Sequence, residues 1–176
     1  VQTLSVNGEQ LLAERPELED ASEADVRVKE RVAEAAKDRV KSSVNVDGLP
    51  EKLAGMFDDA IWEQVSQECL GCGACTYVCP TCHCFDIVDE LDEALGQSGR
   101  RLRIWDSCQY PLFTHQTSGH NPRPSGTQRM RQRIMHKYQY YVATFGIISC
   151  VGCGRCVQCC PVNLDIREVL QILAQK

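Results

Sequence analysis

The sequence lacks any apolar run long enough to cross a membrane, which excludes a membrane-spanning helix. Its first residues, Val1 to Leu12, have neither the basic start nor the apolar stretch of a secretory signal peptide. We therefore expect a cytoplasmic protein. The sequence also lacks an initiator methionine, which suggests the tail of a longer or processed chain.

No general base or nucleophile is assembled in a recognisable form, and no helix-turn-helix or similar reader of nucleic acid is present. The net charge of −5 is ordinary for a globular protein, but it is unevenly placed. Residues 1–68 carry a net charge of −8, whereas residues 69–176 carry +3. Most of the positive charge lies in one basic segment, on Arg100, Arg101, Arg103, Arg123, Arg129, Arg131, Arg133 and Lys137.

Twelve cysteines are the outlying feature of the composition. Eight of them form one motif that occurs twice, C-x2-C-x2-C-x3-C-P, a run that binds [4Fe–4S] clusters in bacterial-type ferredoxins. The copies consist of Cys69, Cys72, Cys75, Cys79 and Pro80, and of Cys150, Cys153, Cys156, Cys160 and Pro161. Disulfides and zinc sites also use paired cysteines. A third and a fourth cysteine at fixed spacing and a following proline, all occurring twice, argue against both.

The spacing predicts which cysteines bind which cluster. Three cysteines at i, i+3 and i+6 let a tight loop wrap one cluster, and the fourth usually ligates the other cluster. Glycines between the ligands tolerate positive φ and bring backbone N–H groups close to sulfur; they are Gly71, Gly73, Gly152 and Gly154. We therefore assign Cys69, Cys72, Cys75 and Cys160 to cluster 1, and Cys150, Cys153, Cys156 and Cys79 to cluster 2.

Four further cysteines lie outside the motif: Cys82, Cys84, Cys108 and Cys159. Cys82 and Cys84 follow the first copy so closely that they could be spare thiols, hydrogen-bond donors or an alternative fourth ligand. We keep Cys79 as the ligand, with Cys82 as its competitor. The positive charge of the basic segment can neutralise two anionic clusters or bind an acidic partner. We favour this interpretation over binding to nucleic acid.

Hydrophobic periodicity predicts mostly helices after an irregular start. Ser22 and Asp25 resemble a capping box before an amphipathic helix that ends near Val40. Further helices are expected over residues 51–67, 89–95 and 127–145, and after Asn163 as N-cap, with residues 101–108 extended. The motifs start 81 residues apart, and the material between them is mostly helical. The predicted fold class is therefore mainly α, an α-helical ferredoxin-like domain over residues 51–176 behind a polar extension, residues 1–50.

Five stretches resemble a known family in their order along the chain. They are Cys79-Pro-Thr-Cys-His-Cys-Phe-Asp86, Arg103-Ile-Trp-Asp-Ser-Cys108, Gly119-His-Asn-Pro-Arg-Pro124, Arg131-Gln-Arg-Ile-Met-His-Lys137 and Cys150-Val-Gly-Cys-Gly-Arg-Cys156. The sequence is similar to the C-terminal dicluster part of the A-type iron–sulfur subunit of anaerobic sulfite reductase. It is equally similar to the β subunit of cytosolic [NiFe] hydrogenases, or sulfhydrogenases. The resemblance runs from about Phe57 to the C-terminus. Family members carry a sizeable N-terminal domain that the residues before Phe57 do not match.

The resemblance implies two [4Fe–4S] clusters and a non-catalytic role in electron transfer. In the family, the protein passes electrons between a flavin- and nicotinamide-binding subunit and a catalytic hydrogenase or sulfite reductase subunit. The terminal reaction and the direction of electron flow stay open. We expect Arg155 and Arg167, in and after the second motif, to raise the potential of cluster 2.

Two other functions compete with electron transfer. One is a subunit similar to heterodisulfide reductase, in which extra thiols are catalytic or bind a non-standard cluster. The adjacent Cys159 and Cys160 suggest it, but they lack the glycine that follows in that motif. The other is an iron–sulfur sensor that binds DNA through the basic segment, which the missing reader motif disfavours.

Overall fold

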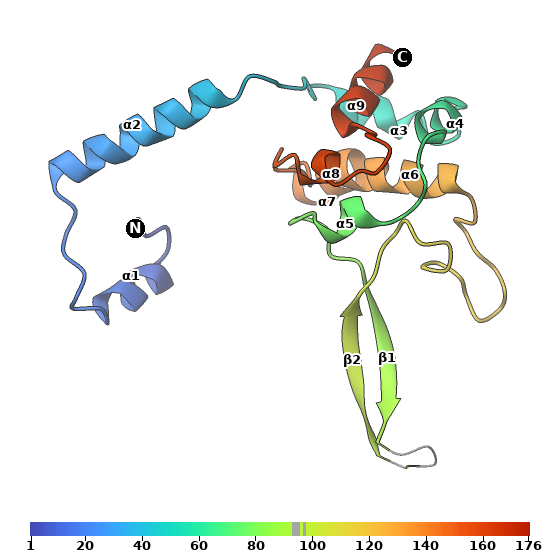
Figure 1. The fold of residues 1–176 in the computed structure, drawn as a ribbon, viewed down its shortest axis with the longest axis horizontal. Coiled ribbons are helices and arrows are strands. Elements are labelled where there is room, and N and C mark those ends of the chain that lie inside the picture. Colours follow the sequence, from blue (N-terminus) through green and yellow to red (C-terminus); the bar gives the residue numbers. More distant parts are fainter. Residues whose placement is uncertain (93–95, 97) are drawn as a thin grey trace. The chain divides into compact units, whose positions relative to one another are not determined.

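A computed structural model divides the chain into two units, residues 1–43 and residues 44–176. Gly48 is the N-cap of the first helix in the second unit. The structure describes residues 1–92, 96 and 98–176 (Figure 1). Within that part of the chain, no helix combines the length and the apolar composition needed to cross a membrane.

The first unit holds two helices, α1 (Val6–Ala13) and α2 (Glu23–Arg39), and neither buries any residue. The expected capping box of α2 is present, because Ser22 and Asp25 bond each other's backbone N–H groups. The expectation that residues 1–20 lack regular structure was wrong for α1. There the Ser5 hydroxyl accepts a hydrogen bond from Gly8 N at 3.2 Å, so a local cap begins a helix that hydrophobic periodicity does not reveal.

The core of the second unit lies between short helices from its two ends and one long helical stretch. Those from the ends are α3 (Leu49–Ala54), α4 (Ile61–Ser66) and α9 (Ile166–Gln175). The long stretch is α6 (Gly126–Met135), a π-helical turn η1 (His136–Tyr140) and α7 (Tyr141–Phe145). Leu53, Ile134 and Leu173 are fully buried where these helices meet. The helix expected over residues 127–145 is therefore present, and Gly146 ends it with a φ of 72°.

Two details of the helices differ from expectation. The single helix predicted over residues 51–67 is broken, because Gly55 ends α3 and Asp59 accepts a hydrogen bond from Ile61 N at 2.8 Å. The side chain of Trp62 is buried and donates to the Met56 carbonyl across this break, at 2.6 Å. The N-cap of α9 is Asp165 rather than Asn163, which instead takes a positive φ of 55°.

An antiparallel hairpin extends from the helices (Figure 1). It pairs β1 (Phe85–Leu91) with β2 (Gly99–Trp105), and Phe85 lies opposite Trp105. The helix predicted over residues 89–95 was wrong for 89–91, which belong to β1, and residues 93–95 lie outside the described part. Ion pairs across the strands, Asp89 with Arg101 and Glu90 with Arg100, support the hairpin instead. Residues 101–105 are extended, as expected.

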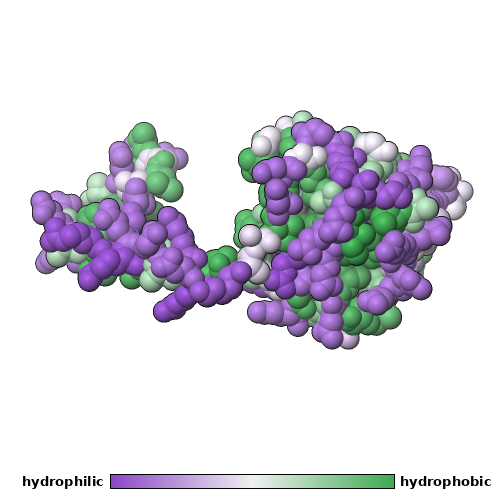
Figure 2. All heavy atoms as spheres, turned by 90° about the horizontal axis from the view of Figure 1, so that it is seen from above, coloured by the Kyte–Doolittle hydropathy of each residue, from purple (hydrophilic) through white to green (hydrophobic). Residues whose placement is uncertain are grey.

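This hairpin also corrects the predicted fold class. Helices account for 44% of the chain, and a two-stranded antiparallel sheet is also present. The predicted class "mainly α" was therefore wrong. The cause is local pairing: the alternating residues of β2 find a partner in β1, whose sequence alone is compatible with a helix. On the visible face of the second unit, hydrophobic residues show between hydrophilic ones (Figure 2).

Candidate metal centres

A short helix follows the second ligand position of each cysteine motif and contains the third, Cys75 or Cys156. These are α5 (Ala74–Tyr77) and α8 (Arg155–Gln158), which contact one another. Each begins at a glycine with positive φ, Gly73 at 77° and Gly154 at 74°. The repeated motif therefore gives a repeated loop-and-helix structure, and the contact between α5 and α8 brings the two copies side by side.

The four cysteines assigned to cluster 1 line one cavity. It encloses about 460 Å³ of empty space, including the part open to solvent, and Cys69, Cys72, Cys75 and Cys160 all contribute to its wall. Cys156, assigned to cluster 2, also reaches this wall. The rest of the lining is largely apolar, with Met130 from α6 and Leu164 before α9. A pocket of thiols in an apolar surround is the environment in which iron–sulfur clusters are held.

Cys79 is directed away from its own loop and toward the second motif. Thr81, two residues on, donates a hydrogen bond to the carbonyl of Ser149 at 2.9 Å, and Ser149 directly precedes Cys150. The Lys137 ammonium lies 3.3 Å from Cys79 Sγ and 3.0 Å from the Ser149 carbonyl. The structure therefore places Cys79 beside the start of the second motif, as the crossed assignment requires. Of the other cluster 2 cysteines, Cys153 is exposed and Cys150 contacts Tyr138.

The donor set fits a polynuclear cluster better than a single ion. Among residues 1–92, 96 and 98–176, no three His, Cys, Asp or Glu side chains converge closely enough to hold one metal ion. A zinc ion needs its ligands gathered on one centre. In a [4Fe–4S] cluster each cysteine binds a different iron atom, so the sulfurs stand farther apart around a larger body.

Arg133 supplies a second observation that fits an anionic cluster. Its side chain is only 4% exposed, lines the cavity, and has an Nε without a hydrogen-bond partner. Burial opposes its charge, yet the thiolates of Cys75, Cys156 and Cys82 raise the pKa of Arg133 above its ordinary value. A buried cation with an unused donor is costly unless negative charge and acceptors face it. Cluster sulfur would supply both.

Comparison with known proteins identifies the family. Residues 68–164, more than half of the chain, match the 4Fe-4S dicluster domain. The chain belongs to this family. It is an iron–sulfur protein of the electron-transfer kind, with two [4Fe–4S] clusters as its cofactors. The resemblance noted from the sequence is thereby confirmed.

A curated relative of the dicluster protein is Sulfhydrogenase 2 subunit beta of Pyrococcus furiosus. It is 36% identical over 167 residues, which are 94% of this chain and 49% of the relative. The chain thus spans about half the length of that relative. No solved structure matched the chain.

Two cations lie beside predicted cluster ligands in this dicluster protein, and the sequence did not single them out. Arg133 and Lys137 lie four residues apart, so they project from one side of the α6–η1 helix, and both are almost completely buried. In the sequence they were only two members of the basic segment. The signal that marks them is their position among the buried Met130, Ile134 and Tyr138 of the same predicted helix.

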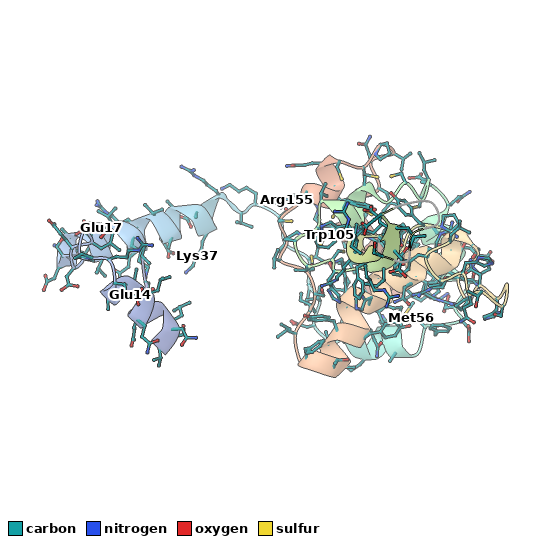
Figure 3. All side chains as sticks on the ribbon, turned by 90° about the horizontal axis from the view of Figure 1, so that it is seen from below. Glu14, Glu17, Lys37, Met56, Trp105 and Arg155 are labelled. Atoms are coloured by element: carbon teal, nitrogen blue, oxygen red, sulfur yellow. The ribbon has the colours of Figure 1, made fainter. Side chains whose placement is uncertain are left out.

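The two arginines that the sequence favoured for tuning cluster 2 are placed differently. Arg155, labelled in Figure 3, is exposed. Arg167 is engaged by the carboxylate of Asp165, with Nε 2.9 Å from Oδ2. Their effect on the potential stays a prediction, whereas Arg133 lines the cavity of the predicted cluster 1 ligands and Lys137 bonds to Cys79, a predicted ligand of cluster 2.

The extra thiols gather next to the cluster ligands. Cys82 lies beside Cys79: the Cys82 thiol lowers the pKa of Cys79 to about 4, and Cys79 raises the pKa of Cys82. Cys84 and Cys108 form a second pair: the Cys108 thiol lowers the pKa of Cys84 to about 6, and Cys84 raises the pKa of Cys108. Cys159 stands apart from both pairs, with Sγ directed to the Cys156 carbonyl. The sequence found these cysteines but could not show how they pair.

Proposed function

We propose that this protein is the electron-relay subunit of an oxidoreductase complex, with Cys69, Cys72, Cys75 and Cys160 binding cluster 1 and Cys79, Cys150, Cys153 and Cys156 binding cluster 2. The observation that carries the proposal is the crossing of the fourth cysteines. Cys160 joins the cavity of the first motif, and Cys79 reaches the start of the second. This crossing supports two clusters held by one shared framework.

When bound, the clusters supply one-electron redox chemistry, and the protein's part is to hold and insulate them. The apolar cavity wall excludes water, while Arg133 and Lys137 place positive charge beside the ligands. Burial, charge and hydrogen bonds to sulfur are the means by which proteins set cluster potentials. A relay of this kind needs no acid or base.

The partners are proposed from the relative and from the family resemblance. A sulfhydrogenase β subunit is by name part of a larger enzyme. We infer that this chain lies between a subunit that binds FAD and NAD(P) and a catalytic subunit of the hydrogenase or sulfite reductase type. A cytoplasmic location remains a prediction.

Iron analysis of anaerobically purified protein tests the cluster count. Two [4Fe–4S] clusters require about eight irons and eight sulfides per chain. A value near four would contradict the proposal of two clusters. Affinity purification of the native complex tests the partners: a [NiFe] or siroheme protein together with a flavoprotein is expected, and recovery without any redox subunit would contradict the relay.

One observation favours a second candidate function, thiol catalysis. Cys84 and Cys108 pair with one another without being assigned to either cluster. A thiol pair of this kind can carry out chemistry on disulfides independently of the clusters.

A further inference from the structure

The base of the hairpin holds two cysteines against one another. The thiol of Cys108 has the largest effect on the pKa of Cys84, and Cys84 has the largest effect on that of Cys108, so the two side chains lie close together. They belong to separate chain segments that the hairpin brings together, since Asp106 N donates to the Cys84 carbonyl at 3.1 Å. This backbone bond continues the pairing of β1 and β2 by one step. The contact is therefore set by the ladder and not by two mobile loops.

The segment that carries Cys108 is also fixed from the side of the helices. Ser107 and Gln109 are almost completely buried. The Ser107 hydroxyl bonds to Thr76 Oγ1 of α5 at 2.7 Å, and Gln109 Nε2 donates to the Arg129 carbonyl of α6 at 2.9 Å. Cys108 is thus held between a β-ladder and two helices, with its sulfur facing Cys84.

The two thiols differ in access. Cys84 is half-buried, whereas Cys108 is 9% exposed. Next to Cys84 lies the cross-strand pair of Phe85 and Trp105, which are 45% and 68% exposed. Trp105 is labelled in Figure 3. An accessible thiol with an aromatic surface beside it, and a covered thiol in contact with it, correspond to the attacking and resolving cysteines of a dithiol centre.

We propose that Cys84 and Cys108 form a dithiol centre that reduces small organic disulfides by thiol–disulfide exchange. This inference rests on the second candidate function above and goes beyond electron relay. The Cys84 thiolate attacks one sulfur of the substrate, the substrate S–S bond breaks, and one thiol leaves after taking a proton. Cys108 then gives up its proton and attacks Cys84 Sγ, which releases the second thiol and closes a disulfide between Cys84 and Cys108. Two electrons have passed from the protein to the substrate. The proton released when the Cys84 thiolate formed and the proton of Cys108 are now on the two released thiols, and an external dithiol restores the centre.

Cys82 links this centre to the rest of the site. Its thiol lies close enough to Cys79 and to Cys108 to affect the pKa of both. Cys82 is therefore a neighbour of the Cys84–Cys108 pair, but it is not the partner of Cys84. For this reason Cys82 is left unchanged in the test.

The experiment uses anaerobically purified protein with its clusters and 2-hydroxyethyl disulfide as the probe. Denaturation, alkylation and peptide mass spectrometry then show the state of each cysteine, and iron is measured on the same sample. In wild-type protein we expect a peptide cross-linked between Cys84 and Cys108 that disappears on treatment with dithiothreitol. In Cys108→Ser we expect a mixed disulfide trapped on Cys84, and in Cys84→Ser we expect release of thiol to slow by about tenfold or more. Cys159→Ser is the matched control and should behave as wild type.

Several results would overturn the centre. Cys84 and Cys108 could both stay fully alkylatable after the probe, or their cross-link could resist dithiothreitol, which would make it a static disulfide. An iron content clearly above eight, lowered in Cys84→Ser, would make the pair ligands of a further cluster. Because the iron of clusters 1 and 2 is measured in the same sample, loss of the exchange with about eight irons retained leaves the relay function standing.

Discussion

Lys137 Nζ lies 3.3 Å from Cys79 Sγ, and the same ammonium group donates to the Ser149 carbonyl at 3.0 Å. It also bonds to Thr81 Oγ1 at 3.1 Å. One buried cation thus joins the end of the first cysteine motif to the residue that precedes the second. Lys137 both positions Cys79 and places a positive charge at a predicted ligand of cluster 2.

Replacing Lys137 with methionine should lower the potential of cluster 2 more than that of cluster 1. A unit charge roughly 6 Å away at an effective dielectric constant of about 20 is worth about 3 kcal/mol. For a one-electron couple this corresponds to a fall of about 130 mV. Redox titration followed by electron paramagnetic resonance measures both clusters. Equal shifts in the two clusters, or none, would contradict this placement of Lys137.

Arg133 should act on both clusters, because it faces Cys75 of the first set and Cys156 of the second. Arg133→Met is expected to lower both potentials by several tens of mV, by the same Coulomb argument. Arg133→Lys keeps the charge and should restore most of the loss. Arg131 on the same helix is the matched control, since its guanidinium is directed to the Phe57 carbonyl, 2.8 Å away.

A titration in which Arg131→Gln lowers the potentials as much as Arg133→Met would contradict a specific role for the buried cation. Iron content must accompany each measurement, because a variant that loses a cluster reports on assembly rather than on potential. If Arg133→Met loses its clusters, the Arg133→Lys variant still tests the role of the charge. Its cluster potentials should then stay close to those of the wild type, although the side chain is different.

The cluster-binding loops could be predicted from the sequence because the spacing of the cysteines determines the loop conformation. The hairpin could not be predicted in this way. Ligands at i, i+3 and i+6 fix a loop, and that loop recurs here with Gly73 and Gly154 in the same conformation. Residues 89–91 instead become a strand because residues 99–101 lie opposite them, with Arg100 and Arg101 paired to Glu90 and Asp89. Pairing of that kind depends on the partner strand, which local periodicity does not report.

The functional cations were missed for a related reason. Arg133 and Lys137 are ordinary members of a basic segment until burial distinguishes them from Arg131 or Arg129. Their neighbours in space, Cys75 and Cys79, are more than fifty residues away along the chain. The pairing of Cys84 with Cys108 is equally non-local. Sequence reasoning located the chemistry-bearing residues, but only the fold shows which of them meet.

The choice between Cys79 and Cys82 as the fourth ligand of cluster 2 can be tested directly. Lys137 and Thr81 both contact Cys79 Sγ, the latter at 3.2 Å, so Cys79 is held in place by several groups. Cys79→Ser should lose about four of eight irons and the signal of cluster 2. Cys82→Ser should keep about eight irons and the signal of cluster 2. Iron analysis with electron paramagnetic resonance decides the matter. Loss of a cluster in Cys82→Ser alone would reverse the assignment.

Gly73 and Gly154 allow a matched test of how tightly the first motif is packed. Both have positive φ, but a Cβ at Gly73 would lie 2.8 Å from Tyr110 Cε1, whereas one at Gly154 would meet nothing within 4 Å. Gly154→Ala should therefore cost only the backbone strain, about 1 kcal/mol. Gly73→Ala adds overpacking and should cost about 2–4 kcal/mol in total.

Denaturant unfolding of the cluster-loaded protein under anaerobic conditions measures the two costs. The double variant Gly73→Ala with Tyr110→Ala removes the ring, and it should recover part of the loss relative to Tyr110→Ala alone. The buried Ser107 hydroxyl, 3.2 Å from the added Cβ, keeps that recovery incomplete. Equal destabilisation by Gly73→Ala and Gly154→Ala would show that the two loops tolerate a side chain alike, and that contact with Tyr110 does not distinguish the first motif from the second.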